Sequence, residues 1–483
     1  MAEYTPPGHH KTFAAFREHL YAFGLDFDAD EDVLGGPEGP LAQPFEASGL
    51  QIGNRFAMHP MEGWDGTSDG LPTAHTLRRW RRFGQSGAKL IWGGEAFAVQ
   101  ADGRANPNQL YLNEDVDVVG GLRALLGQVQ EGHAEAGFAS DGLVVGLQLT
   151  HSGRWARPDG PPAPRTVQRH PILDRRQGIT DDSALLSDDE LAALVPRYVR
   201  AAELAQAAGF DFVDVKACHG YLLHEVLAGR ARAGRYGGSF DNRTRLFVEI
   251  VEAIRAACPG LPIGCRISLA DIHPHRPNAE TRVGEPDRDD ATARYELGFG
   301  AHATDPTAFD LEEPLRFLGL CEGLGIQLIN QTLSSPYWCP HLQRPASYPP
   351  SDGYLPPEDP LRSVLRHLEV VRTGKHLFPD LRFVGTGYTY LQEWLPHVAQ
   401  AEVRQGHVDS VGLGRMALIY PDLVRDVLEG RPLERRRICR TFSDCTTAPR
   451  NGMLSGCFPL DPYYKAMPEA QRLKELKRRV RGS

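Results

Sequence analysis

Eight short hydrophobic segments recur along the chain, and each is followed by sequence that is compatible with a helix. They lie at residues 56–59, 90–92, 143–149, 212–216, 262–268, 326–330, 382–386 and 410–413. Short apolar runs bounded by turn residues are typical of buried strands, and strands that alternate with helices favour a parallel sheet with right-handed crossovers. Eight such units predict a closed (β/α)8 barrel of the α/β class.

The helix after the third segment has a distinct start. Ser187, followed three residues later by Glu190, forms a capping box that satisfies two backbone N–H groups at a helix start. Apolar positions from Leu191 to Ala202 continue at helical spacing, so one face is expected to pack against the sheet. Pro196 interrupts this pattern and predicts a kink.

The barrel pattern occupies residues 42–433, which leaves an extension at 1–41 with a helix over 11–23 and a tail at 434–483. Three connections that follow strands are unusually long, at 152–186, 270–307 and 331–359. Such connections lie over the catalytic face of a barrel, so we expect all three near an active site. The third is rich in proline and aromatic residues, which predicts a rigid substrate wall.

Composition narrows the function without assigning it. The 483 residues are 41% hydrophobic and 24% charged with a net charge of −9, which argues against a nucleic-acid partner. The start, MAEYTPPGHHKTFAAF, lacks the pattern of a signal peptide, and no run of eighteen apolar residues occurs. We therefore expect a cytoplasmic protein without a membrane partner, and we expect its eight cysteines to be free thiols.

The segment 211–243 contains the most informative residues. Its first part alternates like a buried strand, and Lys216, His219 and Tyr221 follow where that strand is expected to end. The carboxyl ends of barrel strands are where active sites lie. Ordinary polar loop residues are the alternative for each of these positions.

The same segment carries a family resemblance. Its HGYLL string and the later YGGS-x-x-NR run resemble the Old Yellow Enzyme group of FMN-dependent NAD(P)H oxidoreductases, especially the branch related to 2,4-dienoyl-CoA reductase. Six further motifs follow the family's order: NRFAMHPMEGWDG, GEAFAV, GLQLTHSGR, CRIS, GTGYTY and GLGRMALIYPDL. The resemblance implies bound FMN, NADH or NADPH as reductant, and a small-molecule substrate. The reaction is then hydride transfer to an activated C=C bond or the reverse dehydrogenation.

The resemblance and the side-chain chemistry suggest which residues bind FMN. Apolar walls for the flavin ring are expected from Pro60, Met61 and Ala96; donors for its pyrimidine edge from Gln148 and Arg266; a phosphate site from Gly387, Gly414 and Arg415. An internal salt bridge is the alternative for Arg266. The run from Gly412 to Ala417 also fits a dinucleotide fingerprint. That fingerprint opens a βαβ unit, whereas here a short helix and then the basic stretch Arg435–Arg437 follow.

By the resemblance, Lys216 and His219 bind the substrate carbonyl oxygen and Tyr221 donates a proton. Lysine stands where the family usually has histidine. It could stabilise a developing enolate more strongly than a neutral imidazole, or it could anchor a polar or acidic substrate. Glu62 is a second departure, and either a general base or an ion pair with Lys216 would explain it. We expect Trp64, Trp155 and Tyr337, together with Trp338, to form an aromatic rim for the substrate.

The tail departs from the family in a third way. The related branch binds a [4Fe–4S] cluster through four cysteines spaced C-x2-C-x3-C-x11-C. Here Cys439, Cys445 and Cys457 remain, but Phe442 stands where the second thiolate is expected, so we expect no cluster and no other metal. The final helix, with Leu473, Leu476 and Val480 at helical spacing, could form a homo-oligomer contact or be a solvated basic helix.

Two other functions stay open at this point. A cofactor-free barrel lyase or aldolase would use Lys216 as a Schiff base. An electron-transfer flavoprotein would bind the flavin without a small substrate of its own.

Overall fold

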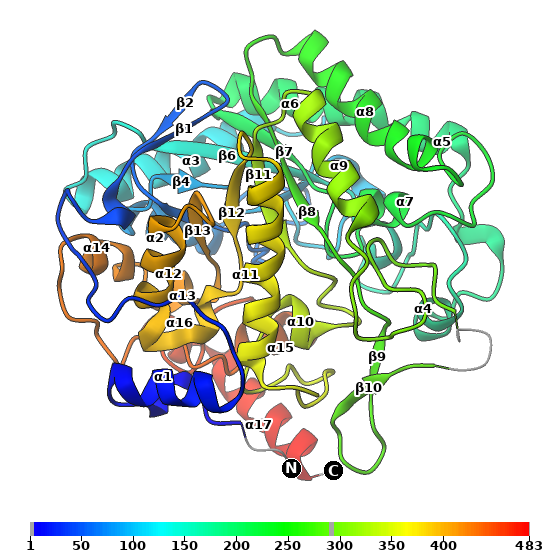
Figure 1. Cartoon of the computed structure of the whole chain (residues 1–483). Coiled ribbons are helices and arrows are strands. Elements are labelled where there is room, and N and C mark those ends of the chain that lie inside the picture. Colours follow the sequence, from blue (N-terminus) through cyan, green and yellow to red (C-terminus); the bar gives the residue numbers. More distant parts are fainter. Residues whose placement is uncertain (1–3, 289–293, 483) are drawn as a thin grey trace.

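A closed parallel barrel lies at the centre of the computed structural model, which describes residues 4–288 and 294–482 (Figure 1). Its strands are β3 (Phe56–Met58), β4 (Leu90–Ile91), β6 (Val144–Thr150), β7 (Phe212–Val215), β8 (Ile263–Ser268), β11 (Leu328–Thr332), β12 (Arg382–Gly385) and β13 (Ser410–Leu413). Neighbouring strands pair in parallel, and β13 returns to β3 with Val411 opposite Phe56. All eight expected strands are confirmed in order, with small shifts at their ends.

Helices surround the barrel as the alternating pattern predicts (Figure 1). The larger ones are α2 (Ala74–Gln85), α3 (Val118–Glu135), α6 (Leu194–Ala208), α8 (Phe240–Ala257), α9 (Glu312–Gly323), α11 (Pro360–Leu377) and α12 (Leu395–Arg404). Their apolar faces and the outer faces of the strands form one continuous core, to which Phe247, Ile329 and Val364 belong. A short extra strand, β5 (Ala96–Ala98), continues the second barrel position and pairs with β6.

The amino-terminal end of the barrel is closed by apolar side chains. Trp92, Phe212 and Leu328 fill its interior and pack with the hairpin of β1 (Phe45–Ala47) and β2 (Leu50–Ile52). This hairpin lies at the opposite end of the barrel from α10 (Pro340–Gln343) and α15 (Asp444–Arg450) (Figure 1). Any deep site is therefore restricted to the carboxyl end of the strands.

The capping box at Ser187 and Glu190 is present, and it starts α5 (Asp188–Ala192). The helix is interrupted as expected, but the break falls at Ala193, before Pro196. Proline then lies in the first turn of α6, where its missing N–H group breaks no helical hydrogen bond.

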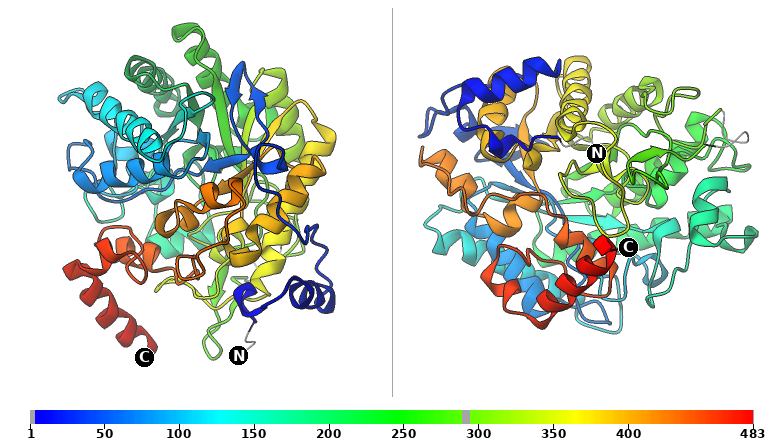
Figure 2. Two further views of the ribbon diagram at one scale, coloured as in Figure 1. Left: turned by 90° about the vertical axis from the view of Figure 1, so that its left-hand side faces the viewer. Right: turned by 90° about the horizontal axis from the view of Figure 1, so that it is seen from below.

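Both end segments pack on the barrel. The expected first helix is α1 (Phe13–Ala22), and its Phe16 ring stacks on Trp394 at a centroid distance of 5.1 Å. The tail contains α15, α16 (Pro462–Lys465) and α17 (Pro468–Gly482) and has a small core of its own. Seen from below, it crosses the carboxyl face of the barrel (Figure 2). The boundaries at 41 and 433 stay predictions.

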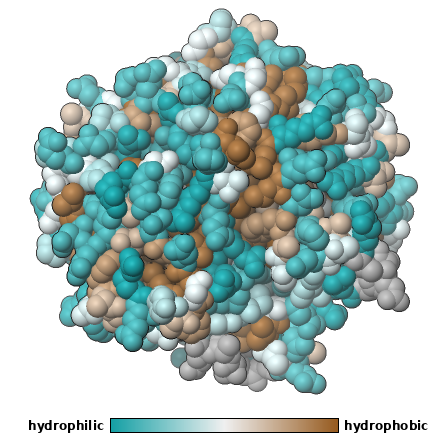
Figure 3. Space-filling model, viewed as in Figure 1, coloured by the Kyte–Doolittle hydropathy of each residue, from teal (hydrophilic) through white to brown (hydrophobic). Residues whose placement is uncertain are grey.

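The apolar stripe of α17 is partly used within the chain. Leu473 is buried and Leu476 packs against the same tail core, whereas the side chain of Val480 lies outside the described residues. The face drawn in Figure 3 is mostly hydrophilic, with an apolar band near its middle. Homo-oligomer formation stays a prediction. In the described part of the chain, every helix is too short or too polar to span a bilayer.

Candidate active site

One cavity of about 700 Å³ opens at the carboxyl end of the strands. It brings together all of the predicted site residues except Trp338. These are Pro60, Met61, Glu62, Trp64, Ala96, Gln148, Trp155, Lys216, His219, Tyr221, Arg266, Tyr337, Gly387, Gly414 and Arg415. Their positions are thereby established, while the role of each stays a prediction.

The catalytic corner follows β7 directly. The chain turns sharply there, because His219 adopts a left-handed backbone conformation with φ of 64° and Gly220 follows with φ of 74°. Two hydrogen bonds hold this turn: the His219 N–H donates to Ser268 Oγ at 3.0 Å, and the Gly220 N–H donates to His224 Nδ1 at 2.9 Å. Tyr221 then begins α7 (Leu222–Leu227). The turn thus points several polar side chains into the cavity from a short segment.

Glu62 joins the corner from the end of β3. Its Oε1 atom lies 3.8 Å from Lys216 Nζ and accepts a hydrogen bond from the Tyr221 hydroxyl at 3.0 Å. The Tyr221 hydroxyl also lies 3.1 Å from that of Tyr337, and Lys216 Nζ lies 3.8 Å from the centroid of the Tyr221 ring. The ion pair between Glu62 and Lys216 is therefore present, and the same carboxylate also accepts the hydrogen bond of the Tyr221 hydroxyl.

Burial shifts the titration of this corner. Burial lowers the pKa of Lys216, while the charge of Glu62 acts in the opposite direction. Burial, followed by the charge of Glu62, holds the pKa of Tyr221 well above its usual range. Burial and the charge of Arg266 keep the pKa of His219 well below its usual range, so this ring is neutral. Its Nε2 atom accepts from the Gln343 amide at 3.0 Å, which leaves Nδ1–H as a donor.

Arg266 projects from β8 into the cavity. Its side chain is 4% exposed, its Nε atom is buried without a hydrogen-bond partner, and no carboxylate of the described residues forms an ion pair with it. Burial lowers its pKa, although Cys218 and Asp214 oppose this change. The internal salt bridge considered for Arg266 is therefore not formed within the described residues.

Asp214 orients the neighbouring donors from inside the barrel. It accepts hydrogen bonds from the Gln148 amide at 2.6 Å, the Trp92 indole at 2.7 Å and the Arg266 backbone N–H at 2.7 Å. Burial raises the pKa of Asp214 to about 6, which these hydrogen bonds partly offset. One Gln148 N–H is thus committed to Asp214, and its other N–H and its oxygen can serve a ligand.

The opposite wall of the cavity contains two arginines. Arg415 Nη2 donates to the Pro345 carbonyl at 2.6 Å, but its Nη1 atom is buried without a partner. Arg344 donates to Thr446 Oγ1 through Nη1, while its Nε and Nη2 atoms are buried without partners. Burial, followed by the charge of Arg415, lowers the pKa of Arg344. Two neighbouring cations with unused donors form a site suited to an anion.

Glycine backbone completes this anion site. Gly387 has φ of 101°, and a Cβ atom at Gly414 would find only Met61 Sδ within 4 Å, at 3.7 Å. A ligand can therefore approach the chain closely at the ends of β12 and β13.

The aromatic residues form a stack. Trp155 and Tyr337 lie parallel at a centroid distance of 4.1 Å, and Tyr337 continues toward Tyr221 at 6.2 Å. Trp64 also lines the cavity. The prediction for Trp338 is wrong: it is 6% exposed, packs against Gly220 and faces a separate small cavity. The indole fits in this position because Gly220 has no side chain: a Cβ atom there would lie 2.2 Å from the Trp338 ring.

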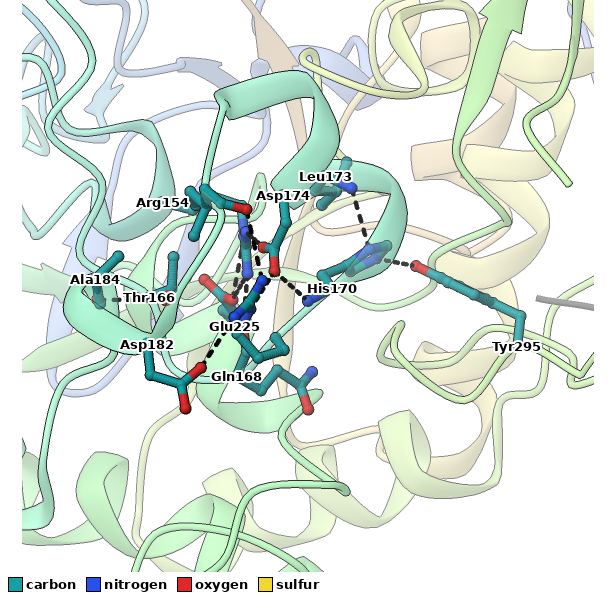
Figure 4. A network of polar contacts seen from close by, with 12 residues as sticks. Arg154, Thr166, Gln168, His170, Leu173, Asp174, Asp182, Ala184, Glu225 and Tyr295 are labelled. Carbon is teal, nitrogen blue, oxygen red and sulfur yellow. Dashed lines mark hydrogen bonds and ion pairs between the residues drawn. The ribbon is translucent and has the colours of Figure 1, made fainter. Parts of the chain in front are cut away.

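A polar cluster is centred on the buried Arg154 (Figure 4). Arg154 donates to Asp174, to Glu225 at 2.6 Å and to the Gln168 carbonyl at 2.8 Å. This arginine ties the connection 152–186, including α4 (Pro171–Gln177), to α7 of the catalytic corner. His170 Nε2 lies 3.1 Å from the hydroxyl of Tyr295, and this contact links the cluster to the connection 270–307. That connection does not line the cavity in its described part, and residues 289–293 lie outside the described chain.

Several residues that line the cavity were not predicted from the sequence. They are Arg157, Arg176 and Gln177 from 152–186, Gln343, Arg344 and Asp352 from 331–359, and Cys445, Thr446, Pro449, Arg450 and Ser455 from the tail. The first two groups lie in connections that were expected near the site, so a search for cations there would have found them. The tail gave no such signal beyond its cysteines, which are free thiols.

The cavity fits a flavin mononucleotide. Arg266, with an unused buried donor, suits the electron-rich pyrimidine edge of the ring, and Pro60, Met61 and Ala96 provide apolar walls. The unused donors of Arg344 and Arg415, beside accessible glycine backbone, suit the phosphate. The observed cavity volume also lies in the range of cofactor sites.

A barrel with these features at its carboxyl end defines the class of FMN-binding (β/α)8 barrels. The model of the NADH:flavin oxidoreductase / NADH oxidase family matches residues 40–284, and the chain belongs to this family. The predicted resemblance and the flavin cofactor class are thereby confirmed. The cofactor-free lyase is not supported.

Known proteins show the same relationship. An NADPH dehydrogenase of Geobacillus sp. (strain WCH70) is 32% identical over 245 residues, which is 48% of this chain and 64% of the relative. The chain thus matches less than two thirds of that relative's length.

Two solved structures share the fold. A 2-naphthoyl-CoA reductase complex has a TM-score of 0.63 at 18% identity, covering 88% of this chain and 57% of its own. The old yellow enzyme homologue from Zymomonas mobilis has a TM-score of 0.55 at 20% identity, covering 81% and 93%.

Proposed function

We propose that the protein is an FMN-dependent oxidoreductase that uses NADH or NADPH to reduce an activated C=C bond in a small polar or acidic substrate. One observation supports this most strongly. A single cavity contains both the Lys216–His219–Tyr221 corner and the buried Arg266, which forms no ion pair within the described residues. When bound, FMN supplies the centre that exchanges hydride with the substrate.

The chain's own groups would bind and polarise the substrate. Lys216 Nζ and His219 Nδ1–H are donors on one side of the cavity, and both can reach a carbonyl oxygen that gains negative charge. Because burial lowers the pKa of Lys216 while Glu62 supports its charged form, the ammonium can respond to a bound anion. His219 acts as a neutral donor, held by Gln343.

Tyr221 would supply the proton. Its hydroxyl lies between Glu62 and Tyr337, so a proton given to the substrate carbon can be replaced through this hydrogen-bonded chain. In the reverse direction the same oxygen accepts a proton, with Glu62 as the nearby base. The stacked Trp155 and Tyr337 rings hold Tyr221 in place and exclude water from one side of its hydroxyl.

Anaerobic spectroscopy tests this proposal. The purified protein should show flavin absorption bands that bleach with NADH or NADPH and return when an enone is added. Lys216→His should keep the flavin and change the rate of reoxidation, because a point-charge donor is replaced by an imidazole. A protein that cannot take up FMN, or whose flavin is not reduced by either nucleotide, would refute it. Borohydride trapping of a carbonyl compound on Lys216 would support the lyase instead.

A further inference from the structure

The cavity is strongly cationic. Its charged lining residues are Arg157, Arg176, Lys216, Arg266, Arg344, Arg415 and Arg450, against the acids Glu62 and Asp352. Buried or half-buried cations require compensation, so each of the seven should have a carboxylate or a ligand nearby.

Three cations are neutralised within the protein. Lys216 pairs with Glu62 at 3.8 Å, and Arg176 pairs with Asp287 at 2.8 Å. Arg450 pairs with Asp352 at 2.5 Å and also donates to the Pro336 carbonyl at 2.9 Å. These pairs balance three of the seven charges, and Lys216 still has ammonium N–H donors for a carbonyl oxygen.

Three more cations suit the cofactor. Arg266 faces the position expected for the flavin ring, and Arg344 with Arg415 forms the phosphate site at the other wall. The remaining cation is Arg157. Within the described part of the chain, its guanidinium makes neither a hydrogen bond nor an ion pair.

The backbone of Arg157 is nevertheless well held. Its N–H donates to the Arg104 carbonyl at 2.8 Å, and the preceding Ala156 N–H donates to the Gly153 carbonyl at 3.0 Å. Two residues earlier, Trp155 is fixed against Tyr337. A rigid segment therefore holds the half-buried guanidinium, which has no partner among the residues that the structure describes.

Arg157 also lies close to the catalytic corner. Burial, followed by the charge of Glu62, raises the pKa of Tyr337 to about 12, and the charge of Arg157 acts against this rise. Tyr337 is in turn hydrogen-bonded to Tyr221. A ligand can thus extend from the Lys216 and His219 donors, past the two tyrosines, to the guanidinium.

On the basis of the proposed function, we propose that Arg157 binds a carboxylate of the substrate. The substrate class is then an unsaturated carbonyl compound with a separate carboxylate: the carbonyl oxygen lies at Lys216 and His219, and the carboxylate lies on Arg157. A planar guanidinium offers two parallel donors that match a carboxylate, which gives both affinity and orientation. The carboxylate sets which end of the substrate enters the reacting position.

Matched acids and esters test the assignment. The probes are cyclohex-2-enones that carry a carboxylate on a chain of one to three methylene groups, each compared with its methyl ester. Binding to the oxidised holoenzyme is measured by calorimetry and by the perturbation of flavin absorption, and kcat/KM by anaerobic flavin reoxidation. The wild-type protein should prefer the best acid over its ester at least tenfold in Kd and in kcat/KM.

Two variants separate Arg157 from general effects. Arg157→Gln should remove the preference for the acid while changing ester values less than twofold. Arg165→Gln removes a cation of the same connection that is paired with Asp102 and Glu190 outside the cavity, and it should keep the preference. Equal binding of acid and ester at every length, or a preference retained in Arg157→Gln, would overturn the inference.

The outcomes also distinguish the two proposals. Selective binding of the acid without flavin reoxidation would support Arg157 and contradict the proposed reduction. Turnover of acid and ester alike, with no effect of Arg157→Gln, would leave the reduction intact and refute the carboxylate site.

Discussion

Arg154 and Arg266 are both buried, at 1% and 4% exposure, but their surroundings differ completely. Arg154 lies between Asp174 and Glu225 and also donates to a backbone carbonyl. Arg266 forms no ion pair within the described residues, and its buried Nε atom has no partner. A buried cation with a full set of partners supports the fold, whereas one without partners is held ready for a ligand.

The difference has an energetic basis. Removing a charge from water costs several kcal/mol, and only close opposite charges or hydrogen bonds offset this. In the Arg154 cluster the protein supplies them, so folding alone fixes the geometry. Around Arg266 the protein supplies few opposite charges or hydrogen bonds. A bound ligand can provide them, and the free energy gained then contributes to binding.

Arg154→Met should have the largest effect. It leaves Asp174 without its buried partner and Glu225 without the two hydrogen bonds that Arg154 donates, so we expect the free energy of unfolding to fall by about 3–5 kcal/mol. Urea denaturation followed by circular dichroism measures this. Arg165→Gln, at a more exposed ion pair of the same connection, should cost less than about 1 kcal/mol. Equal losses in the two variants would show that the Arg154 cluster is not special.

Asp271 is a buried acid that forms no ion pair with a lysine or arginine of the described residues, so it should make the stability of the protein depend on pH. It lies 3.5 Å from His224 beside a cavity of about 20 Å³, and burial raises its pKa to about 7 from 3.8. The folded protein then holds a proton that the unfolded chain releases between pH 4 and pH 7, so this group's contribution to stability falls as pH rises. Relative to Asp271→Asn, the wild-type protein should lose about 3 kcal/mol across this window.

Denaturation of both proteins at several pH values measures the difference. Asparagine keeps an oxygen that can accept the Phe299 N–H, so the comparison isolates the charge. Parallel pH profiles for the two proteins would show that Asp271 ionises normally in the fold.

Arg266→Met should separate binding from folding. Among the described residues, no buried carboxylate loses an ion pair, so the stability of the apoprotein should change by less than about 1 kcal/mol. FMN affinity should fall about 100-fold, which corresponds to about 2.7 kcal/mol. Quenching of flavin fluorescence on titration gives the Kd. If Arg266→Met destabilised the apoprotein as much as Arg154→Met and left FMN binding unchanged, Arg266 would be a structural residue like Arg154 and not a ligand-binding one.

Arg344→Gln is expected to have the smallest effect. It removes one of two cations from the phosphate site, so FMN should bind about tenfold more weakly, or about 1.4 kcal/mol. Riboflavin lacks the phosphate, and its affinity should not change. Arg450→Gln, on the same wall but paired with Asp352, is the control. An equal loss for FMN and riboflavin would place Arg344 at the ring or in the structural framework.

Much of the barrel could be predicted because its signals are local. The capping box at Ser187 and the apolar run of β7 depend on residues within a few positions of each other. The cavity residues from strand ends followed from the fold, because parallel strands bring their carboxyl ends to one face. The break before Pro196 was misplaced by a few residues, since proline is tolerated in a first turn.

Other features depend on contacts between distant segments. Arg344 meets Thr446 of the tail, and Trp338 turns toward Gly220 rather than the cavity. The balance of charge at Arg157 depends on which acids reach which arginines, as Asp287 reaches Arg176 across 111 positions. No short-range pattern encodes these pairings.

The sequence by itself determined the order of strands and helices, the polar corner at Lys216, His219 and Tyr221, and the family to which the chain belongs. Only the tertiary structure decided which charges are neutralised: Arg154 within the protein, Arg266, Arg344 and Arg415 toward the expected flavin, and Arg157 toward a proposed carboxylate. The physical reason is range. Hydrophobic periodicity acts between neighbours in sequence, whereas the compensation of a buried charge depends on every group that folding brings close to it.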